Sequence, residues 1–230
     1  MIDDAATRAI ASLYRPLESG RWALRMGGVV LMRGYWSPPQ FVEMIALVRD
    51  GKTWMSLTPV EVESQQLGVE AAHGHVVIMG LGMGWAAAAT ALKPEVSAVT
   101  VVERDPDVIA MHAELDLFGR LPDEAGEKVR IVAGDALEWR AEGPVDLLIA
   151  DIWLPLVSEG RVEEVRRMWT NTGAEAVHFW GQEMEIAARA GGCDAAGIAA
   201  AVAAMGLPLV GPGTVDYPER VRAAAAAWGR

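Results

Sequence analysis

The chain has 230 residues, 52% of them hydrophobic and 22% charged, with a formal net charge of −11. These values are typical of a globular protein with one substantial core and exclude large-scale disorder. The acidic balance opposes nucleic-acid binding, and one cysteine allows neither an intrachain disulfide nor a cysteine zinc site. The apolar runs are too short for a membrane span, and the start MIDDAATRAI lacks the order of a signal peptide. We therefore expect a soluble cytoplasmic protein without a membrane partner.

The first 57 residues predict a small β-rich lobe. The segment RWALRMGGVVLMRGYW (21–36) indicates two short strands joined as a hairpin at Gly27 and Gly28. The segment SPPQFVEMIALVRDG (37–51) predicts a short helix with a proline-marked start, and KTWMSL (52–57) predicts a further strand.

At Thr58 the pattern changes. Thr58 is placed as a helix N-cap, Pro59 stands at the first helical position, and Glu61 stands where a capping box needs an acid. The predicted helix runs to about Ala72. It opens the second predicted unit, residues 58–230.

From Val76 onward, apolar strands alternate with helices, which indicates a parallel sheet covered by helices on both faces. We expect a Rossmann-like α/β fold, in which ligands bind at the carboxyl ends of the strands. The predicted strands are 76–80, 97–103, 128–135, 144–151 and 174–181. The predicted helices are 85–93, 105–119, 158–170, 183–190, 194–205 and a last one that opens near Pro218.

Alternating glycines end the first of these strands, in HVVIMGLGMGW (75–85). Gly82 and Gly84 fall in the turn before the next helix, where a residue without a Cβ lets the backbone bend sharply and lets a ligand approach it closely. The dinucleotide fingerprint G-x-G-x-x-G would place its last glycine where Trp85 stands. An indole there disfavours a nicotinamide or flavin cofactor. A tight turn with no ligand is the structural alternative.

Acidic residues end the next three strands. Glu103, in VTVVERDP, stands where a carboxylate can accept hydrogen bonds from both hydroxyls of a ribose. Asp135, in AGDALEW, can accept a bond from an adenine amino group or cap a helix. Asp151, in IADIWLP, is a base, a cation-binding group or another cap. Each has a structural alternative, but all stand at consecutive strand ends.

Together, VVIMGLGMGW, VTVVERDPDVI, VRIVAGDALEW and VDLLIADIWLP resemble the S-adenosylmethionine-binding core of class I methyltransferases, and most of all the branch that includes spermidine synthase. The resemblance covers about residues 75–156. It implies that the glycines cradle the methionine part of S-adenosylmethionine or of its decarboxylated form, while Glu103 holds the ribose and Asp135 the adenine. The implied cofactor-binding residues, with flanking positions, are Gly80, Gly82, Gly84, Glu103, Arg104, Asp135 and Ala136.

The same resemblance has departures that bear on activity. Aminopropyltransferases usually carry an aspartate where this chain has Met83, and a second aspartate after the fourth strand where it has Leu154. An ammonium buried against Met and Leu lacks a partner, which is costly. Aminopropyl transfer to a polyamine is therefore disfavoured, unless carboxylates arrive from elsewhere. The antiparallel hairpin that normally closes the methyltransferase sheet is not recognisable after the fifth strand.

We expect methyl transfer to a small-molecule acceptor, with Asp151 accepting a proton or orienting the nucleophile and Trp153 lining the acceptor pocket. The alternatives are an aminopropyltransferase with altered polyamine contacts and a non-catalytic nucleoside-binding protein. No metal site is expected, because His73 and His75 precede the first parallel strand, at the end opposite the crevice. The sequence leaves open whether the protein forms a homodimer.

Overall fold

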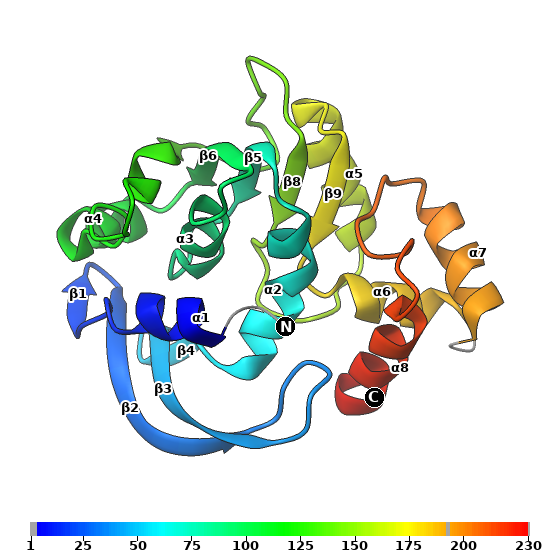
Figure 1. The fold of residues 1–230 in the computed structure, drawn as a ribbon, viewed down its shortest axis with the longest axis horizontal. Helices are drawn as coiled ribbons and strands as arrows, with labels where there is room; N and C mark the ends of the chain where they lie inside the picture. The colour runs from blue at the N-terminus through cyan, green and yellow to red at the C-terminus, as the bar shows by residue number, and fades with distance from the viewer. Residues whose placement is uncertain (1–3, 192–193, 230) are drawn as a thin grey trace.

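The computed structural model describes residues 4–191 and 194–229. The one cysteine, Cys193, lies outside these residues. Figure 1 shows a four-stranded antiparallel sheet, in blue, and a five-stranded parallel sheet, with helix α2 leading from one to the other. None of the described helices is both long enough and apolar enough to cross a bilayer.

The antiparallel sheet is a meander with strand order β1-β2-β3-β4. Helix α1 precedes it along the chain. The bounds are α1 Asp4–Ala11, β1 Leu17–Ser19, β2 Trp22–Met32, β3 Gln40–Arg49 and β4 Lys52–Ser56. The sheet confirms the predicted β-rich lobe and its last strand, but the predictions for residues 21–36 and 37–51 were wrong.

Residues 21–36 hold one long strand rather than a hairpin. The pairing of β2 with β3 shifts register between Met26 and Val29, so Gly27 and Gly28 form an irregularity within the strand and do not reverse the chain. The predicted helix within residues 37–51 is strand β3, which pairs with β2 on one side and β4 on the other. This pairing with the two neighbouring strands overrides the local helical preference.

The parallel sheet has strand order β7-β6-β5-β8-β9, the order of a Rossmann-like sheet, and confirms the predicted fold class. The chain winds outward from β5 to β7 and then returns to place β8 beside β5. The topological switch point therefore lies between β5 and β8. The bounds are β5 Gly74–Met79, β6 Val96–Glu103, β7 Val129–Ala133, β8 Leu147–Ala150 and β9 Ala176–Phe179.

Helices cover both faces of this sheet, which explains the continuous apolar strands. On β5, Val76 and Ile78 pack with α1, α3 and α4, whereas Val77 and Met79 pack with α5, α7 and α8. The helices are α2 Pro59–Ala71, α3 Trp85–Ala91, α4 Pro106–Leu115, α5 Arg161–Thr172, α6 Gln182–Arg189, α7 Ala195–Met205 and α8 Tyr217–Trp228, with a short 3-10 helix at Ala125–Lys128.

The start of α2 differs from its prediction in one respect. Thr58 is the N-cap residue, but its side chain makes no capping bond, and its hydroxyl lies 3.0 Å from Ser56 Oγ. The predicted capping box is therefore not formed. Glu61 instead lines a cavity at the carboxyl edge of the parallel sheet.

After β9 the chain folds into α6, α7 and α8, and Leu209 adds an isolated parallel bridge to Val177. Helix α6 packs against both α7 and α8. In the described ranges no antiparallel hairpin extends the parallel sheet.

Candidate functional site

A cavity of about 560 Å³ lies between the two sheets. Its walls come from the carboxyl ends of the parallel strands on one side and from β2, β3 and β4 on the other. Its size is within the range of small-molecule sites. The residues singled out from the sequence all line it, namely Gly80, Gly82, Gly84, Glu103, Arg104, Asp135, Ala136, Asp151 and Trp153.

The glycine turn after β5 needs glycines for its own packing. Gly80, Gly82 and Gly84 all have positive φ, at 97°, 48° and 78°. A Cβ on Gly80 would lie 2.1 Å from the carbonyl oxygen of Asp151, and one on Gly84 would lie 2.5 Å from His112 Cε1. Close packing alone therefore explains the glycines at these two positions, whatever ligand the turn also contacts.

Two polar side chains hold the turn in place from the core. The buried Tyr14 hydroxyl donates to Met83 O at 2.8 Å, and His112 Nε2 donates to Gly82 O at 3.0 Å. Burial lowers the pKa of His112 to about 4, so this imidazole is neutral at physiological pH. The turn is therefore a fixed surface rather than a loose loop.

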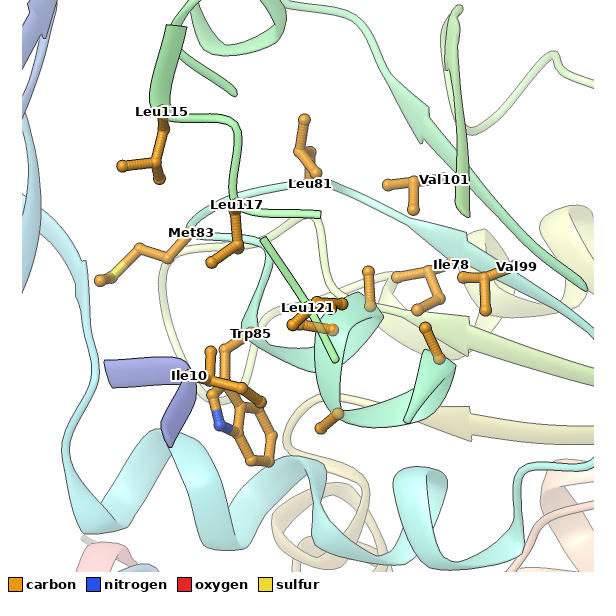
Figure 2. Close-up of a cluster of buried hydrophobic side chains, with 14 of the residues drawn as sticks. Ile10, Ile78, Leu81, Met83, Trp85, Val99, Val101, Leu115, Leu117 and Leu121 are labelled. Carbon is orange, nitrogen blue, oxygen red and sulfur yellow. The ribbon is translucent and has the colours of Figure 1, made fainter. Parts of the chain in front are cut away.

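The side chains next to the glycines lie in the core. Met83 is 1% exposed and Trp85 is 5% exposed, and both belong to the hydrophobic cluster that includes Ile10 of α1 (Figure 2). The indole, expected to crowd the start of the helix, is accommodated by this packing between α3 and α1. From the opposite sheet, Met55 closes over the turn, since a Cβ on Gly82 would lie 2.5 Å from its sulfur.

Glu103 is held rigidly at the end of β6. Its Oε2 accepts from the backbone N–H of Leu81 at 2.9 Å, and its Oε1 accepts from that of Asp105 at 2.8 Å. Each carboxylate oxygen keeps a further lone pair for a ligand donor. The carboxylate therefore links the glycine turn to the start of α4.

Asp135 stands at the start of the loop that follows β7. Its Oδ1 accepts from the backbone N–H of Leu137 at 2.8 Å and so orders a turn, in place of the helix weighed from the sequence. Its Oδ2 makes no hydrogen bond within the described residues. Ala136, next to it, is buried in the cavity wall.

Asp151 faces a second carboxyl group that sequence reasoning missed. Asp151 Oδ2 accepts from Gln65 Nε2 at 2.7 Å. Burial raises the pKa of Asp151 to about 7, against the opposing effect of Arg161. Burial and the charge of Asp151 raise the pKa of Glu61 to about 8. The spacing of Glu61 and Gln65, one helical turn apart, was the available signal, but the apparent capping motif obscured it.

Trp153 is fixed by the buried Arg161. The guanidinium carbon of Arg161 lies 4.2 Å from the centre of the Trp153 ring, and the indole donates to Glu164 Oε2 at 2.5 Å. Arg161 also donates to the carbonyls of Pro155 and Trp180, at 2.5 and 2.8 Å. These bonds anchor the loop after β8, which presents Trp153 to the cavity.

The histidines of the HGH segment lie away from the cavity. His75 bonds through its ring to Thr100 Oγ1 and Pro144 O, each at 2.9 Å. Among the described residues, no three His, Cys, Asp or Glu side chains are grouped so as to hold a metal ion.

Comparison with known proteins gives structural likeness only. No protein-family model and no curated protein matches the sequence. Similar solved structures include a spermidine synthase from Thermotoga maritima, with 14% identity, 70% of this chain and 64% of that chain covered, and a TM-score of 0.40. The methyltransferase domain of bacterial CtHen1-C has 16% identity, coverage of 50% and 64%, and a TM-score of 0.39. The DhpI–SAH complex has 16% identity, 48% of each chain covered, and a TM-score of 0.34.

The chain thus matches less than two thirds of the length of each of these structures. Likeness at this level does not establish a function. The strand order and the glycine turn after the first parallel strand give the chain a Rossmann-like α/β fold.

Proposed function

We propose that the cavity binds S-adenosylmethionine and that the protein transfers the methyl group to a small-molecule acceptor. One observation carries the proposal. The glycine turn, Glu103, Asp135 and Asp151 follow four adjacent parallel strands and line a single cavity at the switch point. This is where open α/β sheets bind their ligands.

The polar groups suit a nucleoside. Glu103 is oriented by two backbone amides and has lone pairs left for ribose hydroxyls. Asp135 Oδ2 is available to an adenine amino group, and the buried Ala136 offers an apolar contact beside it. Gly80, Gly82 and Gly84 line the wall along which the methionine part would lie.

When bound, S-adenosylmethionine would supply a methyl group on a sulfonium that carries its own leaving group. The protein then needs to align the acceptor and exclude water. A carboxyl group with a pKa of about 7, such as Asp151, exists in both protonation states near neutral pH and is suited to accepting a proton from an acceptor. Trp153, held by Arg161, forms the wall beside it.

Calorimetric titration tests the nucleoside site. The wild-type protein should bind S-adenosylmethionine and methylthioadenosine. Glu103→Gln and Asp135→Asn should each weaken the binding of both ligands by about tenfold, because each variant loses a hydrogen bond to a charged group. Glu142→Gln, in the exposed turn before β8, is the matched control and should bind normally. Unchanged affinity in both site variants would refute the nucleoside assignment.

The role of Asp151 is tested by turnover. Release of S-adenosylhomocysteine is measured against a panel of amines, phenols and carboxylic acids. Asp151→Asn should lower turnover by about 100-fold or more with any acceptor that the wild-type protein methylates. Full turnover in this variant would remove Asp151 from the chemistry.

A second candidate is aminopropyl transfer, which the Glu61–Asp151 pair favours. These carboxyl groups line the cavity from α2 and β8 and supply partners that the Met83 and Leu154 positions lack. Incubation with decarboxylated S-adenosylmethionine and putrescine distinguishes the two reactions, because aminopropyl transfer releases methylthioadenosine and methyl transfer does not. Nucleoside binding without turnover in either assay would indicate a binding protein.

A further inference from the structure

The lobe side of the cavity carries a cluster of two indoles and one guanidinium, formed by Trp22, Arg49 and Trp54. We propose that Arg49 binds a carboxylate of the ligand. This inference deepens the proposed function and rests on it for the identity of the site. It assigns a role to the antiparallel sheet, which the sequence motifs leave without one.

The cluster is geometrically defined. The rings of Trp22 and Trp54 meet edge to face, with centroids 5.4 Å apart and planes at 78°. The guanidinium carbon of Arg49 lies over both, 5.1 Å from the Trp22 centroid and 5.6 Å from the Trp54 centroid. These distances fall within the range of cation–π attraction. The arginine is therefore held by aromatic rings rather than by an acid.

The guanidinium of Arg49 lacks acceptors within the described residues. It makes no hydrogen bond or ion pair there, and its Nε is buried without a partner. By contrast, Arg21, on the same side of the cavity, is paired with Asp50. Arg161, on the sheet side, donates to backbone carbonyls. A donor that is kept from water without an acceptor, as Nε is, is costly, and a bound ligand can satisfy it.

The rest of the wall limits where an anion can bind. Glu103 lies on the sheet side and would repel a carboxylate. A guanidinium stacked on aromatic rings keeps its in-plane N–H groups free, and their fork matches a carboxylate with two parallel hydrogen bonds. The guanidinium and the two indoles therefore form a cationic, aromatic part of the wall that is suited to a carboxylate.

Two ligands could bring this carboxylate. One is the α-carboxylate of S-adenosylmethionine, since Met55, near Trp54 on β4, contacts the glycine turn. The other is a carboxylate on the acceptor. The indoles could hold the rest of that acceptor if it were planar. Decarboxylated S-adenosylmethionine lacks the first group, so comparing the two forms separates these sources.

The experiment is calorimetric titration of the wild-type protein and of Arg49→Met with four probes. They are S-adenosylmethionine, its decarboxylated form, methylthioadenosine, and benzoate with and without S-adenosylhomocysteine. If Arg49 binds the α-carboxylate, Arg49→Met weakens the binding of S-adenosylmethionine by about tenfold or more and leaves the binding of the decarboxylated form unchanged. If Arg49 binds the carboxylate of the acceptor, both forms of S-adenosylmethionine bind to Arg49→Met as they do to the wild-type protein, and the binding of benzoate weakens by a similar factor. Arg49→Lys should keep part of the affinity, because it keeps the charge without the fork.

Arg25→Met is the matched control. Arg25 carries its positive charge on β2, the strand next to that of Arg49, and pairs with Glu18 outside the cavity. This variant should leave all four titrations unchanged. The proposal is overturned if Arg49→Met binds every carboxylate probe as the wild-type protein does, or if the wild-type protein binds none of them. Failure of the nucleoside site is separate, because it appears as loss of methylthioadenosine binding in the wild-type protein.

Discussion

The two sides of the cavity differ in origin and in chemistry. The sheet side comes from consecutive strand ends and presents the glycine turn with Glu103, Asp135 and Asp151. The lobe side comes from an antiparallel meander and presents two indoles with the guanidinium of Arg49, which has no hydrogen-bond or ion-pair partner among residues 4–191 and 194–229. The first side is set by local sequence motifs, whereas the second is created by the pairing of consecutive strands in the meander. A ligand that uses both would be recognised at opposite ends by opposite charges.

The largest effect should follow a change at the glycine turn. Gly80→Ala would place a Cβ 2.1 Å from a backbone oxygen at a residue with φ of 97°, so the end of β5 or of β8 must move. We expect a loss of about 3 kcal/mol or more in the free energy of unfolding, measured by chemical denaturation.

Gly213→Ala is the control for this change, because a Cβ there meets no atom within 4 Å. It should alter stability by less than about 1 kcal/mol. If Gly80→Ala were equally mild, the close packing of the turn against Asp151 would be wrong.

The carboxyl pair on the sheet side predicts a pH dependence of stability. The folded protein holds protons on Asp151 up to a pKa of about 7 and on Glu61 up to about 8, whereas the unfolded chain releases them near its ordinary values of about 4. Stability should therefore fall as pH rises from about 6.5 to about 8; at lower pH the lowered pKa of His112 and His178, each about 4, acts in the opposite direction. Thermal unfolding should show Tm falling by several degrees over this window, by about 2–4 °C for each kcal/mol.

Glu61→Gln removes one of these groups and should flatten the dependence. Part of the slope should remain, because burial also raises the pKa of Glu183, beneath α8, to about 7. A Tm that rises with pH over the same window in the wild-type protein would contradict the buried, protonated pair.

A hydrogen bond between the two sides of the cavity should contribute a smaller amount. Trp22 of β2 donates through its indole to Asp105 Oδ2, at the N-cap of α4, at 2.8 Å. Trp22→Phe keeps most of the apolar contact and removes this bond. We expect a loss of about 1–2 kcal/mol in unfolding free energy, since the acceptor is charged. Asp105→Asn made in the Trp22→Phe variant should then add little to the loss in unfolding free energy. If the losses of the two single variants simply add, the two residues are not coupled.

The smallest effect concerns the support beneath the turn. Tyr14→Phe removes the hydroxyl that donates to Met83 O and leaves a buried carbonyl without that donor. The expected loss is about 1 kcal/mol, measured by denaturant unfolding. No change would indicate that the turn holds its shape without the segment after α1.

These differences explain what the sequence could predict. The parallel sheet was predictable because its strands are short apolar runs. Asp105, which caps α4, and the glycine turn also mark the ends of two of these strands. The long β2–β3 pair was not predictable, because each strand is fixed by pairing with the other across the loop that joins them, and because Gly27 and Gly28 also fit a hairpin turn. The sheet side of the site followed from strand ends, but Glu61 and Arg49 reach the cavity only through tertiary packing.

The most direct test of the central claim is a crystal structure of the protein grown with S-adenosylhomocysteine. The account predicts the nucleoside across the ends of β6 and β7, with the ribose hydroxyls bonded to Glu103 and the adenine amino group bonded to Asp135. A nucleoside bound elsewhere, or within the cavity but turned so that neither carboxylate contacts it, would contradict the account.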